Sequence, residues 1–64
     1  MERAILEIQF AFLEAHATML GRNMASKQRR RIALSVSETE ELQHTINCLL
    51  ACEQALIAIQ QKNN

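Results

Sequence analysis

The fold is decided by residues 37–62, the stretch SETEELQHTINCLLACEQALIAIQQK. It contains neither Gly nor Pro, so nothing in it breaks a helix. Ser37 and Glu40 have the spacing of a capping box at a helix start, and Ser35 with Glu38 offers the same box two residues earlier. We therefore predict one long helix that begins near residue 37, with the earlier box as the alternative start.

Apolar side chains in this helix form two neighbouring ridges, because successive residues are rotated by about 100°. The first ridge contains Leu42, Cys48, Leu49, Cys52, Leu56 and Ile59, and the second contains Ile46, Leu50 and Ile57. Together the ridges span roughly 200°, twice the roughly 100° stripe that a single neighbour requires. We expect this helix to contact more than one neighbouring element.

Length and composition predict an all-α protein with a single domain over residues 1–64. The chain has one Gly and no Pro, which argues against folds rich in β-turns. A chain of 64 residues lies near the lower size limit for burying its own core, and a second copy is one common remedy. The formal net charge is zero, so no overall field attracts the molecule to nucleic acid or opposes self-association.

Several features predict a cytoplasmic protein. The two cysteines lie in mid-helix and do not form the pattern of a secreted disulfide scaffold. Glu2, Glu7 and Glu14 interrupt the N-terminal apolar segment, so we expect no signal peptide. The longest apolar runs have five residues, too few to span a membrane.

A first helix is predicted over residues 2–20, ended by Gly21. Its polar strip is narrow, so much of its circumference needs apolar neighbours. We expect the two helices to pack as an antiparallel hairpin and the hairpin to dimerise into a four-helix-type bundle. The residues expected in the core or dimer interface are Ile5, Ile8, Phe12, Met19, Leu42, Ile46, Leu49, Leu50, Leu56 and Ile57.

Residues 21–36 form a predicted connector that holds five of the seven basic residues: Arg22, Lys27, Arg29, Arg30 and Arg31. Apolar residues alternate after the arginines, which favours an extended segment, although residues 24–34 could form a short third helix. The cluster has two interpretations. In the first, it is a solvated linker whose positive charges balance the acidic start of the second helix. In the second, it contacts a partner, and we favour a protein partner over nucleic acid.

Three polar residues, Gln9, His16 and Glu53, fall inside the apolar arcs of their helices. Polar groups at such positions can fix the register and copy number of helical bundles. We expect either a polar layer between helices or subunits, or side chains at a wet rim.

A third group, His44, Cys48 and Cys52, has successive i,i+4 spacing. One such pair can share a zinc ion, but the outer two lie about 12 Å apart at 1.5 Å per residue, too far to share one. We interpret them as buried thiols beside a partly solvated histidine, with no metal or other cofactor. The chain also lacks Asp and Gly-rich turns, so we expect no enzyme.

The predicted hairpin resembles the format of the Rop family of plasmid RNA-binding regulators, which dimerise into four-helix bundles. As a very small helical chain with reduced cysteines, it also resembles the small accessory proteins of lambda-like temperate phages. That resemblance implies a modulator of host or developmental processes. The segment RRRIALSVSETEEL is similar to the strand-into-helix opening of ribbon-helix-helix repressors, but only one helix follows it where that fold has two.

Two functions follow from these patterns. The first is a non-enzymatic, dimeric protein–protein interaction and regulatory protein whose protein partner is unidentified. The alternative is a nucleic-acid-binding regulator that uses Arg29, Arg30 and Arg31.

Overall fold

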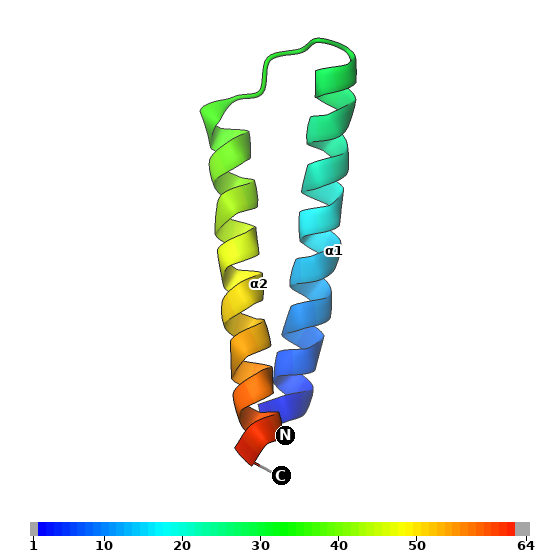
Figure 1. Ribbon diagram of the computed structural model, residues 1–64. Coiled ribbons are helices and arrows are strands. Elements are labelled where there is room, and N and C mark those ends of the chain that lie inside the picture. Colours follow the sequence, from blue (N-terminus) through cyan, green and yellow to red (C-terminus); the bar gives the residue numbers. More distant parts are fainter. Residues whose placement is uncertain (1, 63–64) are drawn as a thin grey trace.

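The computed structural model describes residues 2–62 as a hairpin of two long helices (Figure 1). Helix α1 comprises Glu2–Arg29 and helix α2 comprises Val36–Lys62. The helices run antiparallel, so both ends of the chain lie at one end of a rod that measures 49 × 16 × 15 Å. The prediction of an all-α helical hairpin is confirmed for the described residues.

Helix α1 is longer than predicted, and the predicted end at residue 20 is wrong. Gly21 has a negative φ and continues the helix. Glycine permits a left-handed helix end but does not impose one, and the Arg, Met, Ala, Lys and Gln residues that follow are good helix formers. The predicted connector over residues 21–36 therefore shrinks to residues 30–35, and residues 24–29 extend α1 instead of forming a third helix.

The end of α1 is a Schellman motif centred on Arg31. The Arg31 amide donates to the Gln28 carbonyl at 3.0 Å, and the Ile32 amide donates to the Lys27 carbonyl at 2.8 Å. Arg31 itself has φ 59°, the left-handed conformation that this motif requires and that glycine usually supplies. Helix α1 thus ends eight residues after the only glycine of the chain.

The start of α2 is the earlier of the two possible capping boxes. The Glu38 amide donates to Ser35 Oγ at 3.1 Å, while the Ser35 amide donates to Glu38 Oε1 at 3.3 Å. These two bonds satisfy amides that the helix leaves unpaired at its start. The predicted start at Ser37 is late, because Val36 is already helical.

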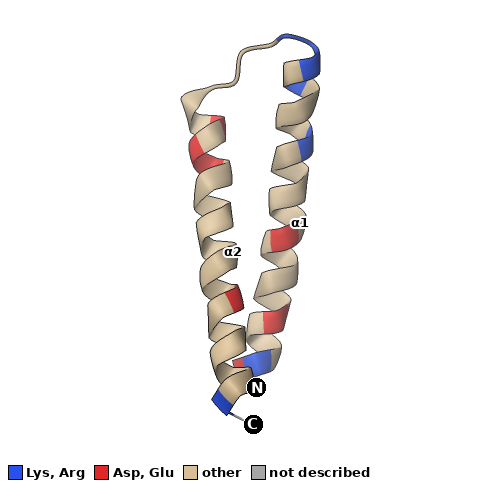
Figure 2. Ribbon diagram, in the orientation of Figure 1, with Lys and Arg blue, Asp and Glu red and all other residues tan. Residues whose placement is uncertain are grey.

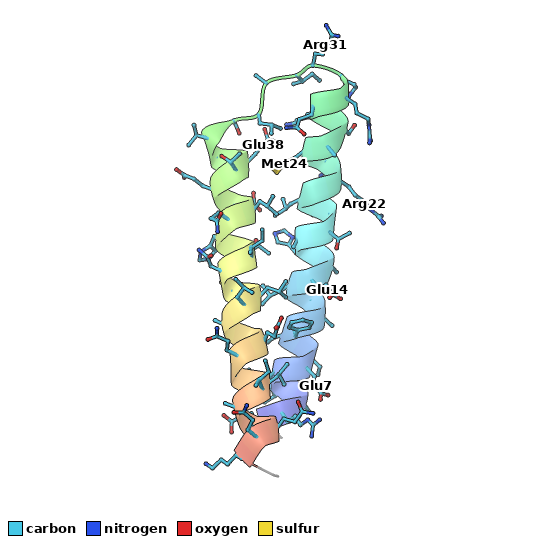
Figure 3. All side chains as sticks on the ribbon, in the orientation of Figure 1. Glu7, Glu14, Arg22, Met24, Arg31 and Glu38 are labelled. Atoms are coloured by element: carbon cyan, nitrogen blue, oxygen red, sulfur yellow. The ribbon has the colours of Figure 1, made fainter. Side chains whose placement is uncertain are left out.

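The helices meet along a seam in which less exposed residues recur at alternating spacings of three and four, as in coiled coils. We define the seam as Leu6, Phe10, Leu13, Ala17, Leu20, Met24 and Lys27 of α1 with Glu38, Leu42, Thr45, Leu49, Cys52, Leu56 and Ile59 of α2. At its loop end, Lys27 Nζ lies 2.8 Å from Glu38 Oε2. Figure 3 shows Met24 and Glu38 between the two helices.

This seam buries little surface. Among residues 2–62, only Thr45 and Cys52 are buried, with 5% and 7% exposure. Thr45 Oγ1 donates to the Glu41 carbonyl at 2.9 Å, and the Cys52 thiol donates to the Leu6 carbonyl on α1 at 3.2 Å. Because two helices alone leave most apolar side chains at least partly exposed, one copy has a thin core. Neither described helix is long and apolar enough to cross a membrane.

Candidate functional site

Large apolar side chains remain exposed on both sides of the seam. On α1 they are Ile5, Ile8, Phe12 and Met19, and on α2 they are Val36, Ile46, Leu50 and Ile57. Phe12 is 75% exposed and Ile8 is 69% exposed, although both belong to residue types that are usually inside proteins. Large exposed apolar patches on soluble proteins are usually interaction sites.

One side of the hairpin contains an open apolar groove of about 640 Å³. We call this side the groove face. Its lining residues are Leu6, Ile8, Gln9, Phe12, Leu13, Cys48, Ala51, Cys52 and Ala55. The α1 edge carries the projecting Ile8 and Phe12, whereas the α2 edge carries small side chains such as Ala51 and Ala55. The groove face therefore has a ridge and a depression side by side.

The other side, which we call the opposite face, carries the exposed Ile46, Leu50 and Ile57 of α2. Helix periodicity places these residues on the flank of α2 that points away from the groove. On α1 the same face presents Glu7 and Glu14 beside the small residues Ala4, Ala11 and Thr18. The opposite face thus combines three bulky apolar side chains of α2 with the acidic Glu7, Glu14 and Glu53.

The residues predicted for the core or dimer interface separate into two groups. Leu42, Leu49 and Leu56 lie in the seam and pack within one chain. The remaining seven are exposed: Ile5, Ile8, Phe12, Met19, Ile46, Leu50 and Ile57. The leucines of the first predicted ridge of α2 therefore pack against α1, whereas the second ridge does not.

The three polar residues predicted to fix the register lie on different faces. Gln9 lines the groove, and His16 lies one heptad further along the same line of α1. His16 Nε2 is 3.4 Å from Glu41 Oε1, which ties the loop half of α1 to α2 on this side. Glu53 is exposed on the other flank of α2, so the three side chains do not come together within one chain.

Basic residues gather at the loop end of α1, opposite the acidic start of α2 (Figure 2). Lys27 pairs with Glu38, and this pair, helped by the Ser35 amide, lowers the pKa of the Glu38 carboxyl from its ordinary value of 4.5. Arg22 points away from α2, and Arg31 lies at the tip of the loop (Figure 3). Arg29, Arg30 and Arg31 are all exposed and form no salt bridge within the described part of the chain. We call these three arginines the basic tip.

The sulfur and imidazole groups do not converge on one point. His44 Nε2 lies 3.7 Å from Cys48 Sγ, whereas the Cys52 thiol points across the seam to Leu6. Both cysteines are free. Between residues 2 and 62, no three side chains of the metal-ligating types are grouped closely enough to hold a metal ion.

Sequence reasoning missed two features of this surface. The groove was not predicted, although the small residues Cys48, Ala51 and Ala55 recur at helical spacing and could have indicated it. The left-handed Arg31 was also missed, because no sequence signal distinguishes it from Arg29 or Arg30. Comparison of the chain with protein-family models, with curated proteins and with solved structures finds no match.

Proposed function

We propose that this chain is a non-enzymatic protein–protein interaction protein with a regulatory role, and that it acts as a homodimer. The observation that carries the proposal is the exposed apolar surface on both sides of the seam. A lone hairpin would leave Phe12 and Leu50 in water, on opposite sides of the rod. Covering one face with a second copy would shield about half of this surface.

The other apolar face then supports contact with a target protein. A dimer built on one face still presents its second face twice, once from each copy. Apolar helix faces of this kind fit grooves or helices of partner proteins. A bivalent surface would also bind a paired target more tightly than a single hairpin could.

The test of this function is light scattering coupled to size exclusion, followed by affinity capture from lysate with and without nuclease. The proposal expects a dimer, and a captured protein that survives nuclease treatment. A monomer at high micromolar concentration would contradict the dimer. Loss of all captured protein after nuclease treatment would instead favour the alternative below.

The alternative function is nucleic-acid binding through the basic tip, and one observation specifically favours it. Arg31 occupies a conformation in which glycine is preferred, and retained backbone strain of this kind is often tied to function. With Arg29 and Arg30 it presents three guanidinium groups that no acid neutralises within the described part of the chain.

This alternative predicts a steep dependence on salt. Binding of a fluorescent RNA or DNA duplex should weaken as ionic strength rises, since phosphate contacts release counterions. Replacing Arg29, Arg30 and Arg31 together by Ala should abolish binding. If the triple variant retains function, the basic tip is not the functional site.

A further inference from the structure

We propose that the second copy docks on the groove face, antiparallel to the first, with the two-fold axis passing beside Phe12 and Cys48. This inference rests on the proposed homodimer and adds which face forms it and in which orientation. In this arrangement α1 packs on α1 of the partner, and α2 packs on α2 of the partner. The loops then lie at opposite ends of a four-helix bundle.

The spacing of the exposed stripe on α1 supports an antiparallel contact. The stripe consists of Ile5, Ile8, Phe12, Ala15 and Met19, and its two ends, Ile5 and Met19, each lie seven residues from Phe12. A two-fold interface must be self-complementary. Centring it on Phe12 places Ile5 against the partner's Met19 and Ile8 within one residue of the partner's Ala15. Apolar side chains thus meet along the whole length of the stripe, and Ile8 lies near a small residue.

The same arrangement accounts for the polar residues on this face. Gln9 and His16 both lie on the flank of the stripe, and they are almost equally far from Phe12 in sequence. An antiparallel pair of helices therefore brings Gln9 opposite the partner's His16, twice. Glu41 Oε1 lies 3.4 Å from Nε2 of the His16 ring, and the Gln9 amide can donate to or accept from the other ring nitrogen. Two such bonds would fix the register of the bundle.

Small residues on α2 allow the two α2 helices to approach each other. Cys48, Ala51 and Ala55 line the α2 edge of the groove, and Ile8 and Phe12 line its α1 edge. Cys48 therefore lies at nearly the same level along the rod as Phe12. A two-fold axis through this level brings Cys48 close to the partner's Cys48.

Charge favours the antiparallel orientation over one with both loops at the same end. The loop end carries five basic residues against three acidic ones, so it is positive. The open end carries four acidic residues, Glu2, Glu7, Glu14 and Glu53, against the basic Arg3 and Lys62. Antiparallel packing places each positive end beside the partner's negative end, whereas parallel packing would bring like charges together.

The area available is sufficient for a stable dimer. The rod is 49 Å long and 16 Å wide, so one side covers roughly the 800 Å² that each partner buries in a standard interface. Each side of the hairpin is thus large enough for one interface of standard size. The groove face is the more apolar of the two, because Glu7, Glu14 and Glu53 lie on the opposite face.

The first test compares Phe12→Glu on the groove face with Leu50→Glu, a matched control on the opposite face. Both positions are exposed in one hairpin, so neither change disturbs the seam. We expect Phe12→Glu to weaken dimerisation at least about 30-fold, as for a central interface residue, and Leu50→Glu to leave the dimer intact. A dimer that survives Phe12→Glu overturns the proposed face.

The second test cross-links the thiols of the wild-type chain with a short bismaleimide. Cys52 is buried, so Cys48 is the reactive thiol. We expect a covalent dimer in the wild type and none in Cys48→Ala. Absence of the covalent dimer in a wild type that is dimeric in solution overturns the orientation, and it does so even if Phe12→Glu fails to fold.

The outcomes separate this inference from the function on which it rests. A wild-type chain that remains monomeric at every concentration contradicts the homodimer and the groove-face contact together. A wild-type dimer that is broken by Leu50→Glu but not by Phe12→Glu keeps the homodimer and moves it to the opposite face.

Discussion

Arg31 is the residue at which the chain departs furthest from what its sequence indicates. The left-handed conformation costs a residue with a side chain roughly 1–2 kcal/mol, and glycine adopts it freely. The three adjacent arginines look equivalent in the sequence. Only the geometry of the Schellman motif shows that one of them bears this cost.

Replacing Arg31 by Gly should therefore raise the free energy of unfolding by about 0.5–1 kcal/mol, after the greater entropy of glycine in the unfolded chain is subtracted. The matched control is Arg31→Ala, which removes the same charge but keeps the backbone strain. Denaturant unfolding of both variants at one protein concentration measures the difference. Equal stability of the two variants would show that the conformation at residue 31 is not strained.

Glu38 links the stability of the loop end to pH. Its pKa is lowered in the folded chain, by Lys27 first and then by the Ser35 amide. The folded state therefore binds fewer protons at this carboxyl than the unfolded state does, and the stabilisation is fully present above pH 4.5. It is lost as the pH falls through the lowered pKa.

Acid titration of the free energy of unfolding should show this loss below pH 4.5, with a shallower slope in Glu38→Gln. Glu40→Gln is a suitable control, because it removes a carboxylate from the same turn but leaves the Lys27 pair in place. A slope that is as steep in Glu38→Gln as in the wild type would contradict the role of this carboxyl.

At the scale of the helices, the start of α2 could be predicted only to within two residues. Two overlapping boxes with Ser and Glu three residues apart occur in the sequence, and both are locally plausible. The structure uses Ser35 and Glu38. Lys27 also bonds Glu38 from the end of α1, and that bond depends on how the two helices align, which no local pattern contains.

The two serines provide a direct comparison. Ser35→Ala should lower the free energy of unfolding by about 1 kcal/mol, because it removes the side chain that caps α2. Ser37→Ala should have little effect, since Ser37 lies inside the first turn and is exposed. Thermal or denaturant unfolding distinguishes the variants. The opposite order of effects would place the cap at Ser37.

The predicted length of α1 is wrong because Gly21 does not end the helix. Glycine costs about 1 kcal/mol relative to alanine inside a helix, so a long α1 with an internal glycine is less stable than it could be. Nothing lies within 4 Å of the position that a Cβ at residue 21 would occupy.

Gly21→Ala should accordingly raise the free energy of unfolding by about 0.5–1 kcal/mol. Circular dichroism should show unchanged or slightly greater helicity. A destabilised variant would show instead that α1 ends near residue 20, as the sequence first suggested.

At the scale of the whole molecule, the sequence predicted excess apolar surface but not which ridge of α2 packs on α1. Leu42, Leu49 and Leu56 of the first ridge form the seam, together with the unpredicted Thr45. The second ridge is interrupted by Glu53, which breaks its continuity as a contact surface. Either apolar ridge of α2 could pack against α1, because the two are similar in the sequence. The sequence alone does not show which ridge packs and which remains exposed.

The helical hairpin itself could be predicted, because local signals agree over most of its length. Capping residues, apolar periodicity and the absence of Pro all favour long helices. The groove face could not be predicted in the same way. It forms where Ile8 and Phe12 of α1 lie beside small residues of α2, and this depends on the alignment of two helices distant in sequence.

The molar mass in solution tests the central claim most directly, namely that a second copy covers the exposed apolar surface. One chain has a mass of 7.3 kDa. Light scattering at micromolar concentration should give twice this value, with full helicity by circular dichroism. A fully helical particle of 7.3 kDa at high micromolar concentration would contradict the account.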